Sequence, residues 1–180
     1  DVERSRGLGD VYKRQRYPVP QHICEITNGL IDQNVLHFDK SANDDMTLTY
    51  HDSCNVARAS SMGGIMGGQF TIPRKIIQTV ANNFYDMDDE TIREKTYCCG
   101  GGGGLLTDDL MELRVKGALP RMEALKHLIE EKGVTHMAAI CAICKSQFSK
   151  VFQYYDLELD QIVSLHQLVS NALIMNKKEV

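Results

Sequence analysis

The sequence contains no tryptophan, only four prolines, and no long apolar run. A transmembrane helix needs about 20 consecutive, mostly apolar residues, so no membrane span is expected within this sequence. Hydrophobic residues still make up 43% of the chain and charged residues 24%. This is the composition of a globular domain, and any membrane association is expected to depend on partner subunits.

A concentration of basic charge is also missing. The chain carries 20 lysines and arginines against 24 acidic residues, for a net charge of −4. Nucleic acid is therefore not an expected partner. No apolar leader or twin-arginine signal is visible, and reduced thiols fit the cytoplasm, so a cytoplasmic location is expected.

Cysteine, in contrast, is abundant and patterned. Five of the six cysteines fall into three groups: Cys54, the adjacent pair Cys98 and Cys99, and a C-x-x-C formed by Cys141 and Cys144. Iron–sulfur clusters require soft, anionic sulfur ligands that grip the irons from several sides. The pattern favours an iron–sulfur redox protein.

Other uses of these cysteines remain open at this point. Structural zinc uses four ligands, usually in two spaced pairs, whereas here there are five candidates and one pair has no spacer. A disulfide framework suits small secreted domains, and 180 residues can bury a core without it. Thioredoxin-like chemistry would use Cys141 and Cys144 but leave the other three without a purpose.

Four stretches carry a family resemblance. TYHDSCNVARAS, GGQFTIPRKII, REKTYCCGGGGGLLTDDLMELRVKGALPRMEAL and HMAAICAICKSQF resemble the cysteine-rich CCG domain of the heterodisulfide reductase B/D family. Within that family they are most similar to the DsrK-type subunits of the membrane complex associated with dissimilatory sulfite reduction. The similarity runs from about Ile23 to about Leu173.

The resemblance implies a cofactor and its ligands. It implies a non-cubane [4Fe-4S] cluster, with ligand and catalytic roles for five cysteines: Cys54, Cys98, Cys99, Cys141 and Cys144. It also implies an oxidoreductase that passes electrons to a disulfide or trisulfide. The implied partners are a quinol-oxidising, membrane-bound cytochrome b-type subunit, other subunits of a redox complex and a small sulfur-carrier protein as substrate. The implied location is the inner face of the membrane.

Two alternatives stay open beside this interpretation. One is an iron–sulfur subunit of a related oxidoreductase that acts on heterodisulfide, glycolate or lactate. The other is a non-catalytic, zinc-binding interaction module.

The glycine run from Gly100 to Gly104 has two possible uses. It could cradle phosphate before a helix, but the Lys-Ser/Thr pair of a P-loop is missing, and Asp108 and Asp109 would repel a polyphosphate. We therefore expect Gly100 and Gly101 to help bind the cluster, through tight turns and N–H···S hydrogen bonds.

The order of elements predicts an α/β fold, with a mainly parallel sheet flanked by helices and the cysteine loops at the carboxyl ends of strands. Residues 1–20 are expected to be a tail or truncated boundary, and 21–180 the CCG-type domain, as the C-terminal part of a larger subunit. Strands are expected at Met46–Tyr50, Lys95–Tyr97, Val134–Ile140 and near Ile162. Helices are expected at Gln21–Gln33, Thr71–Phe84, from Thr107 to Gly133 with a kink or division at Pro120, at Lys145–Tyr155, and up to Leu173.

Three further residues can be interpreted from their positions. Cys24 lies on the apolar stripe of the first helix and is expected to be an inert core residue. His51 and His136 lie near cysteine loops, and each is either a hydrogen-bond donor or proton carrier near the cluster or a structural residue.

Overall fold

The computed structural model describes residues 20–157 and 161–175. The predicted tail lies outside these ranges, except for Pro20. No helix in the described part of the chain is both long and apolar enough to cross a bilayer.

A three-stranded parallel sheet forms the centre of the fold. It consists of β1 (Leu48–His51), β2 (His136–Ala139) and β3 (Ile162–Ser164), in the order β1-β2-β3. The register pairs His51 with Ala139, so β1 and β2 end side by side. This confirms the predicted α/β fold class with a parallel sheet. All four residues of β1 are buried, as expected when helices cover both faces of a parallel sheet.

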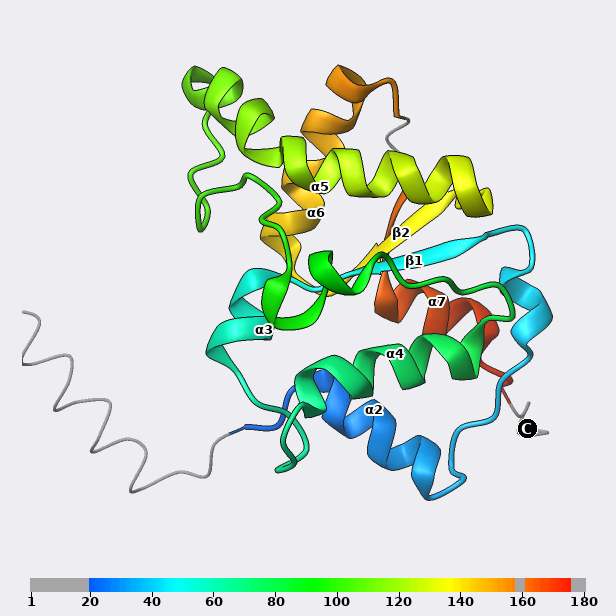
Figure 1. The fold of residues 1–180 in the computed structure, drawn as a ribbon. Helices are drawn as coiled ribbons and strands as arrows, with labels where there is room; N and C mark the ends of the chain where they lie inside the picture. The colour runs from blue at the N-terminus through cyan, green and yellow to red at the C-terminus, as the bar shows by residue number, and fades with distance from the viewer. Residues whose placement is uncertain (1–19, 158–160, 176–180) are drawn as a thin grey trace, which may run out of the picture.

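Helices cover the two faces of the sheet. Figure 1 shows α2 (Ile23–Asp32), α4 (Gly68–Val80) and α7 (Leu165–Ala172) on one side, and α5 (Met111–Lys132) and α6 (Ala142–Val151) on the other. Two apolar cores result. The first contains Leu48 and Tyr50 of β1, packed with α4 and α7. The second contains Met137 of β2, packed with α5 and α6.

One predicted strand is wrong. Arg93–Lys95 forms a short 3-10 helix, and Lys95–Tyr97 pairs with no strand in the described part of the chain. The backbone carbonyls of Glu94 and Thr96 accept hydrogen bonds from the Arg58 side chain instead of from a neighbouring strand. A side chain distant in sequence thus replaces the sheet ladder here.

Helix boundaries differ from the predicted ones in several places. A short helix, α3 (Cys54–Ala59), was not predicted, and α6 begins directly after Cys141 rather than at Lys145. Pro120 lies within α5 and does not divide it. Gly133 ends α5 in the left-handed conformation, as predicted for a C-terminal cap.

Candidate metal centre

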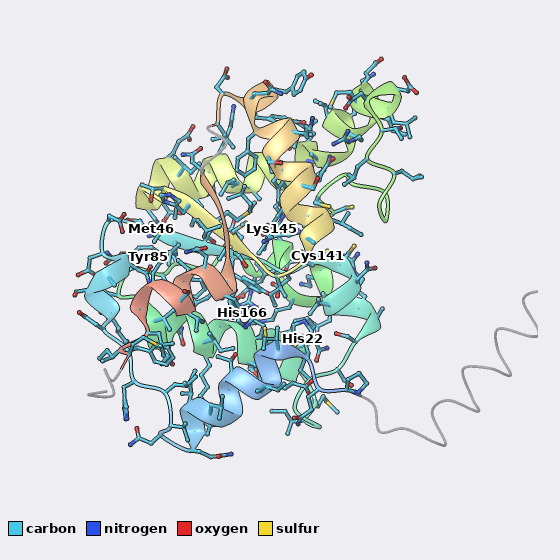
Figure 2. All side chains as sticks on the ribbon, turned by 180° about the vertical axis from the view of Figure 1, so that it is seen from behind. His22, Met46, Tyr85, Cys141, Lys145 and His166 are labelled. Carbon is cyan, nitrogen blue, oxygen red and sulfur yellow. The ribbon has the colours of Figure 1, made fainter. Side chains whose placement is uncertain are left out.

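Two cysteine groups follow neighbouring parallel strands. Cys54 opens α3 shortly after β1, and Cys141 is the N-cap of α6 shortly after β2. Figure 2 shows Cys141 where β2 passes into α6, with Lys145 on the first turns of the same helix. The carboxyl ends of parallel strands are where α/β folds place their binding sites. The sequence placed these two groups correctly relative to the strands.

Four thiols form a continuous chain. The Cys98 side chain lies within hydrogen-bonding reach of Cys99 and Cys54, and Cys99 lies within reach of Cys144. Cys141 packs against the same apolar core as Cys99 and Cys144. The structure thus brings together four of the five cysteines that were predicted as ligands and places Cys141 against the core that contains two of them, while the role of all five as ligands stays a prediction.

The thiols of the adjacent pair are hard to ionise. The hydrogen bond with Cys99, followed by burial, raises the pKa of Cys98 well above its usual value. The hydrogen bond with Cys144 raises the pKa of Cys99 to about 12. Both thiols are therefore protonated near neutral pH, and metal binding would have to displace their protons.

The arrangement is a chain of thiols rather than a closed cage. In the described ranges, no three histidine, cysteine or carboxylate side chains form a group that could hold a single metal ion. The five sulfurs come from three separate loops and helix starts.

Cys24 lies elsewhere. It is fully buried in the first core, on α2, and burial raises its pKa to about 12. This agrees with the expectation of a core residue.

The glycine run shapes the backbone around two of the sulfurs. The Gly100 N–H donates to Cys98 Sγ at 3.3 Å, and the Gly101 N–H donates to Cys99 Sγ at 3.4 Å. Gly100 has φ +82°, and a Cβ there would lie 2.5 Å from the Arg114 carbonyl oxygen. N–H groups aimed at sulfur favour anionic thiolates, so the backbone fits a thiolate-bound cluster.

Three polar contacts position the Cys98–Cys99 loop without a strand. Arg58 of α3 donates to the carbonyls of Glu94 and Thr96, just before the cysteine pair. The Thr96 hydroxyl donates to the Asp52 carbonyl at 2.8 Å. These bonds tie the loop to the segment that carries Cys54.

Asp52 is in turn held by a buried ion pair. Arg74 of α4 donates to both Asp52 carboxylate oxygens, at 2.9 and 2.7 Å, and to both oxygens of Asp86. The Arg93 N–H also donates to Asp52. These carboxylates stabilise the charged form and keep the pKa of Arg74 above its usual value, although burial opposes this.

His51 is the buried histidine closest in sequence to the site. Its ring contacts Phe148 of α6 edge-on, and neither ring nitrogen has a hydrogen-bond partner among the described residues. Burial, with a smaller contribution from Arg121, lowers its pKa well below the usual value, so the ring is neutral. His136 begins β2, at the opposite end from Cys141, and its ring is hydrogen-bonded to Thr135.

Sequence reasoning missed Asp52 and Arg121. Both are charged and buried, and both contact Thr96 just before the cysteine pair. The sequence gives no signal for Arg121, because an arginine on a long, mostly polar helix normally indicates a solvated face. Asp52 had one weak signal, its place between a strand and a candidate ligand.

Comparison with known proteins shows the family to which the chain is similar. A family model described as the CCG cysteine-rich domain matches residues 48–149. The chain is 43% identical over 154 residues to the "Hdr-like menaquinol oxidoreductase iron-sulfur subunit 2" of Archaeoglobus fulgidus. It is equally similar to the "Hdr-like menaquinol oxidoreductase iron-sulfur subunit" of Archaeoglobus profundus. The match covers 86% of this chain but only 26% of each relative, so the chain spans about a quarter of their length. No solved structure matches the chain.

Proposed function

The chain belongs to the CCG cysteine-rich domain family, and from this membership we propose that it is the iron–sulfur electron-transfer domain of a heterodisulfide-reductase-like oxidoreductase. The observation that carries the proposal is the chain of four thiols, Cys54, Cys98, Cys99 and Cys144, with Cys141 at the start of the helix that carries Cys144. Soft sulfur donors from three loops suit an iron–sulfur cluster better than they suit a single ion.

The proposed cofactor is a non-cubane [4Fe-4S] cluster, with the five cysteines as ligands. The bound cluster would supply one-electron transfer and an iron atom where a sulfur substrate can bind. The protein holds the sulfurs through α3, the glycine run and the first turn of α6. The N–H groups of Gly100 and Gly101 would stabilise thiolate charge, and buried apolar residues such as Phe148 would exclude water from the inner side.

The proposed acceptor is a disulfide or trisulfide, as in DsrK-type subunits of dissimilatory sulfur metabolism. Cleavage of one sulfur–sulfur bond takes two electrons and two protons, and it leaves two thiols from a disulfide or a thiol and a persulfide from a trisulfide. The site must therefore receive two electrons for each bond that is cleaved. The name of the curated relatives, menaquinol oxidoreductase subunits, supports a quinol as the electron source. The cysteines are proposed as the catalytic residues because they hold the irons.

The proposed partners follow from this electron path. A membrane cytochrome b-type subunit would oxidise the quinol, other subunits of the complex would relay electrons, and a small sulfur-carrier protein would bring the substrate. The domain would lie on the cytoplasmic, inner face of the membrane, held there by these subunits. The relatives are named as subunits of a menaquinol oxidoreductase, and this supports the proposed arrangement.

Spectroscopy and metal analysis of anaerobically purified protein test the cofactor. We expect iron and acid-labile sulfide in equal amounts, and an EPR signal from the oxidised protein that a cubane cluster does not give. Zinc without sulfide would instead support an interaction module and contradict the proposal.

Reduction of a soluble trisulfide or heterodisulfide by the reduced protein, compared with glycolate and lactate oxidation, tests the substrate class.

A further inference from the structure

Three arginines are buried in the described part of the chain, and they differ in their partners. Arg74 is paired with two carboxylates, Asp52 and Asp86. Arg114 donates to Gln147 and to the Thr107 carbonyl, and an exposed carboxylate, Asp108, lies 3.9 Å away. Arg121 forms no ion pair with any carboxylate that the structure describes.

Arg121 is fully buried on α5. Its guanidinium donates to Met87 Sδ, to the Thr91 carbonyl and to Thr96 Oγ1, the last at 3.0 Å. The guanidinium carbon lies 5.6 Å from the centre of the Tyr97 ring. Its Nε has no hydrogen-bond partner among the described residues. All the hydrogen bonds of the buried Arg121 cation thus go to neutral groups.

This cation lies at the inner side of the cysteine site. Thr96 and Tyr97, which it contacts, directly precede the Cys98–Cys99 pair. Its charge also interacts with the buried Asp52 carboxylate, which Arg74 already binds, and more weakly with the Cys144 thiol and the buried His51 ring. Burial lowers the pKa of Arg121 to about 10, so the side chain is still charged at neutral pH.

A buried cation with no carboxylate in contact is costly, because it has lost its water and gained little opposite charge. Five thiolates around an iron–sulfur core carry more negative charge than the core offsets, so the filled site is anionic. Net charge and nearby charges are among the main determinants of cluster potential. The Asp52 carboxylate is already hydrogen-bonded to Arg74 and to the Arg93 N–H, so the contacting counter-charge that Arg121 lacks is the one that the cluster would supply.

We propose that the Arg121 guanidinium is the buried counter-charge of the iron–sulfur cluster and raises the reduction potential of the filled site. This inference rests on the proposed function, because it requires a cluster at the five cysteines. A positive charge in a dry site stabilises the more negative, reduced state. Arg121 is a positioning and tuning residue here, since it is proposed to act through charge and not as a ligand.

The competing explanation is that Arg121 only ties the segment from Met87 to Tyr97 to α5. Such a structural role would equally explain why the hydrogen bonds of Arg121 are buried. Substitution by glutamine removes the charge but keeps an amide donor, whereas substitution by lysine keeps the charge and loses the planar fork. The two variants therefore separate charge from hydrogen bonding.

The first test is an anaerobic redox titration of the cluster, followed by EPR. In Arg121→Gln we expect at least a tenfold fall in the ratio of reduced to oxidised cluster at a fixed potential, which is a shift of about −59 mV for one electron. Arg121→Lys should retain most of the wild-type potential. Lys126→Gln, which removes a partly exposed charge from the same helix, should leave the potential unchanged.

A second measurement keeps the proposal testable if a variant is unstable. The melting temperature is compared before and after cluster reconstitution. A counter-charge predicts a smaller rise on reconstitution in Arg121→Gln than in wild type and Arg121→Lys. A purely structural tie predicts a lower melting temperature in both states and an unchanged rise.

Failure of the counter-charge proposal and failure of the proposed function give different results. An unchanged potential in a fully loaded Arg121→Gln protein, or equal shifts in the Gln and Lys variants, overturns the counter-charge and leaves the proposed function intact. Wild-type protein that assembles no iron–sulfur cluster contradicts the proposed function itself.

Discussion

The buried cysteines have two different roles. Cys99 lies among other thiols and is a candidate ligand, whereas Cys24 only fills an apolar core. Cys99 and Cys24 are both buried, and both have a pKa raised to about 12. The causes differ: a hydrogen bond with Cys144 is the largest for Cys99, and burial is the largest for Cys24. The neighbours of a cysteine, and not its burial, distinguish a candidate ligand from a core residue.

Replacement of Cys99 by Ser tests this division. We expect Cys99→Ser to lose most of the bound iron, because hard oxygen replaces soft sulfur and the binding free energy of a metal site is also folding free energy. Cys24→Ser should keep the wild-type iron content while costing about 1–3 kcal/mol of stability, because a hydroxyl enters an apolar core. Iron analysis and urea unfolding measure both. Equal iron loss in the two variants would be inconsistent with the five-ligand model.

Gly100 provides a second test at this scale. Gly100→Ala should lower the free energy of unfolding by more than the ~1–2 kcal/mol typical of a left-handed non-glycine residue, because its Cβ would also meet the Arg114 carbonyl. Gly101→Ala should change the EPR line shape, since its Cβ would lie 3.3 Å from Cys99 Sγ.

Gly133→Ala is the matched control for the glycines. Gly133 is also left-handed, but a Cβ there meets no atom within 4 Å. We expect a loss of about 1 kcal/mol and an unaltered EPR spectrum. A spectrum in Gly100→Ala and Gly101→Ala that is identical to wild type would show that close backbone approach does not matter.

His51 predicts a pH dependence of stability. Its folded pKa is depressed, so the unfolded state binds a proton first, at a pH near its ordinary pKa of about 6.5. The contribution to stability is therefore complete above about pH 6.5 and falls by about 1.4 kcal/mol per pH unit below it. His51→Phe should remove this slope from urea unfolding measured on metal-free protein between about pH 5 and 7. Parallel pH curves for the two proteins would contradict it.

Elements are joined near the site mainly by arginines. Arg58 connects α3 to the loop before Cys98, and Arg74 connects α4 to Asp52, in the segment between β1 and α3. The two arginines differ in burial. Arg58 is exposed, whereas Arg74 is 7% exposed and paired with two carboxylates.

Replacement of Arg74 should therefore strongly lower the free energy of unfolding. Arg74→Gln leaves Asp52 buried without its cation, which typically costs about 3–5 kcal/mol. Lys116→Gln breaks an exposed pair with Glu112 and should cost less than about 1 kcal/mol. Urea unfolding compares the two variants. Similar small losses in both would show that the buried pair contributes little to holding α4 against the β1–α3 segment.

For the whole molecule, the sheet separates a core that supports the fold from a core that supports the site. The first core contains Cys24 and Ile77, and the second contains Cys99, Cys144 and Phe148. Both cores should contribute to stability, but only the second touches the candidate ligands.

Large-to-small substitutions in each core test this separation. We expect Ile77→Ala to lose about 2–5 kcal/mol and Phe148→Ala about 3–5 kcal/mol. Only Phe148→Ala should also alter the EPR spectrum of the folded protein, because Phe148 belongs to the same core as Cys99 and Cys144 and contacts His51. An altered spectrum in Ile77→Ala as well would mean that the two cores are not independent.

The local pattern alone located the three strands of the sheet and two of the three cysteine groups, although it also predicted a strand at Lys95–Tyr97 that does not form. Apolar strands that run directly into Cys54 and Cys141 predict ligands at the carboxyl ends of parallel strands, and the structure has both cysteines there. Gly133 was predictable for the same reason, because a helix end needs only local chemistry.

Only the tertiary structure decided how the Cys98–Cys99 loop is held and where charge is buried. In place of the predicted strand before Cys98, the carbonyls of Glu94 and Thr96 accept hydrogen bonds from Arg58, which is far away in sequence. Arg121 is buried because helix α5 packs its face against the segment from Met87 to Tyr97. Such contacts depend on packing between distant segments, which residue type and spacing do not encode.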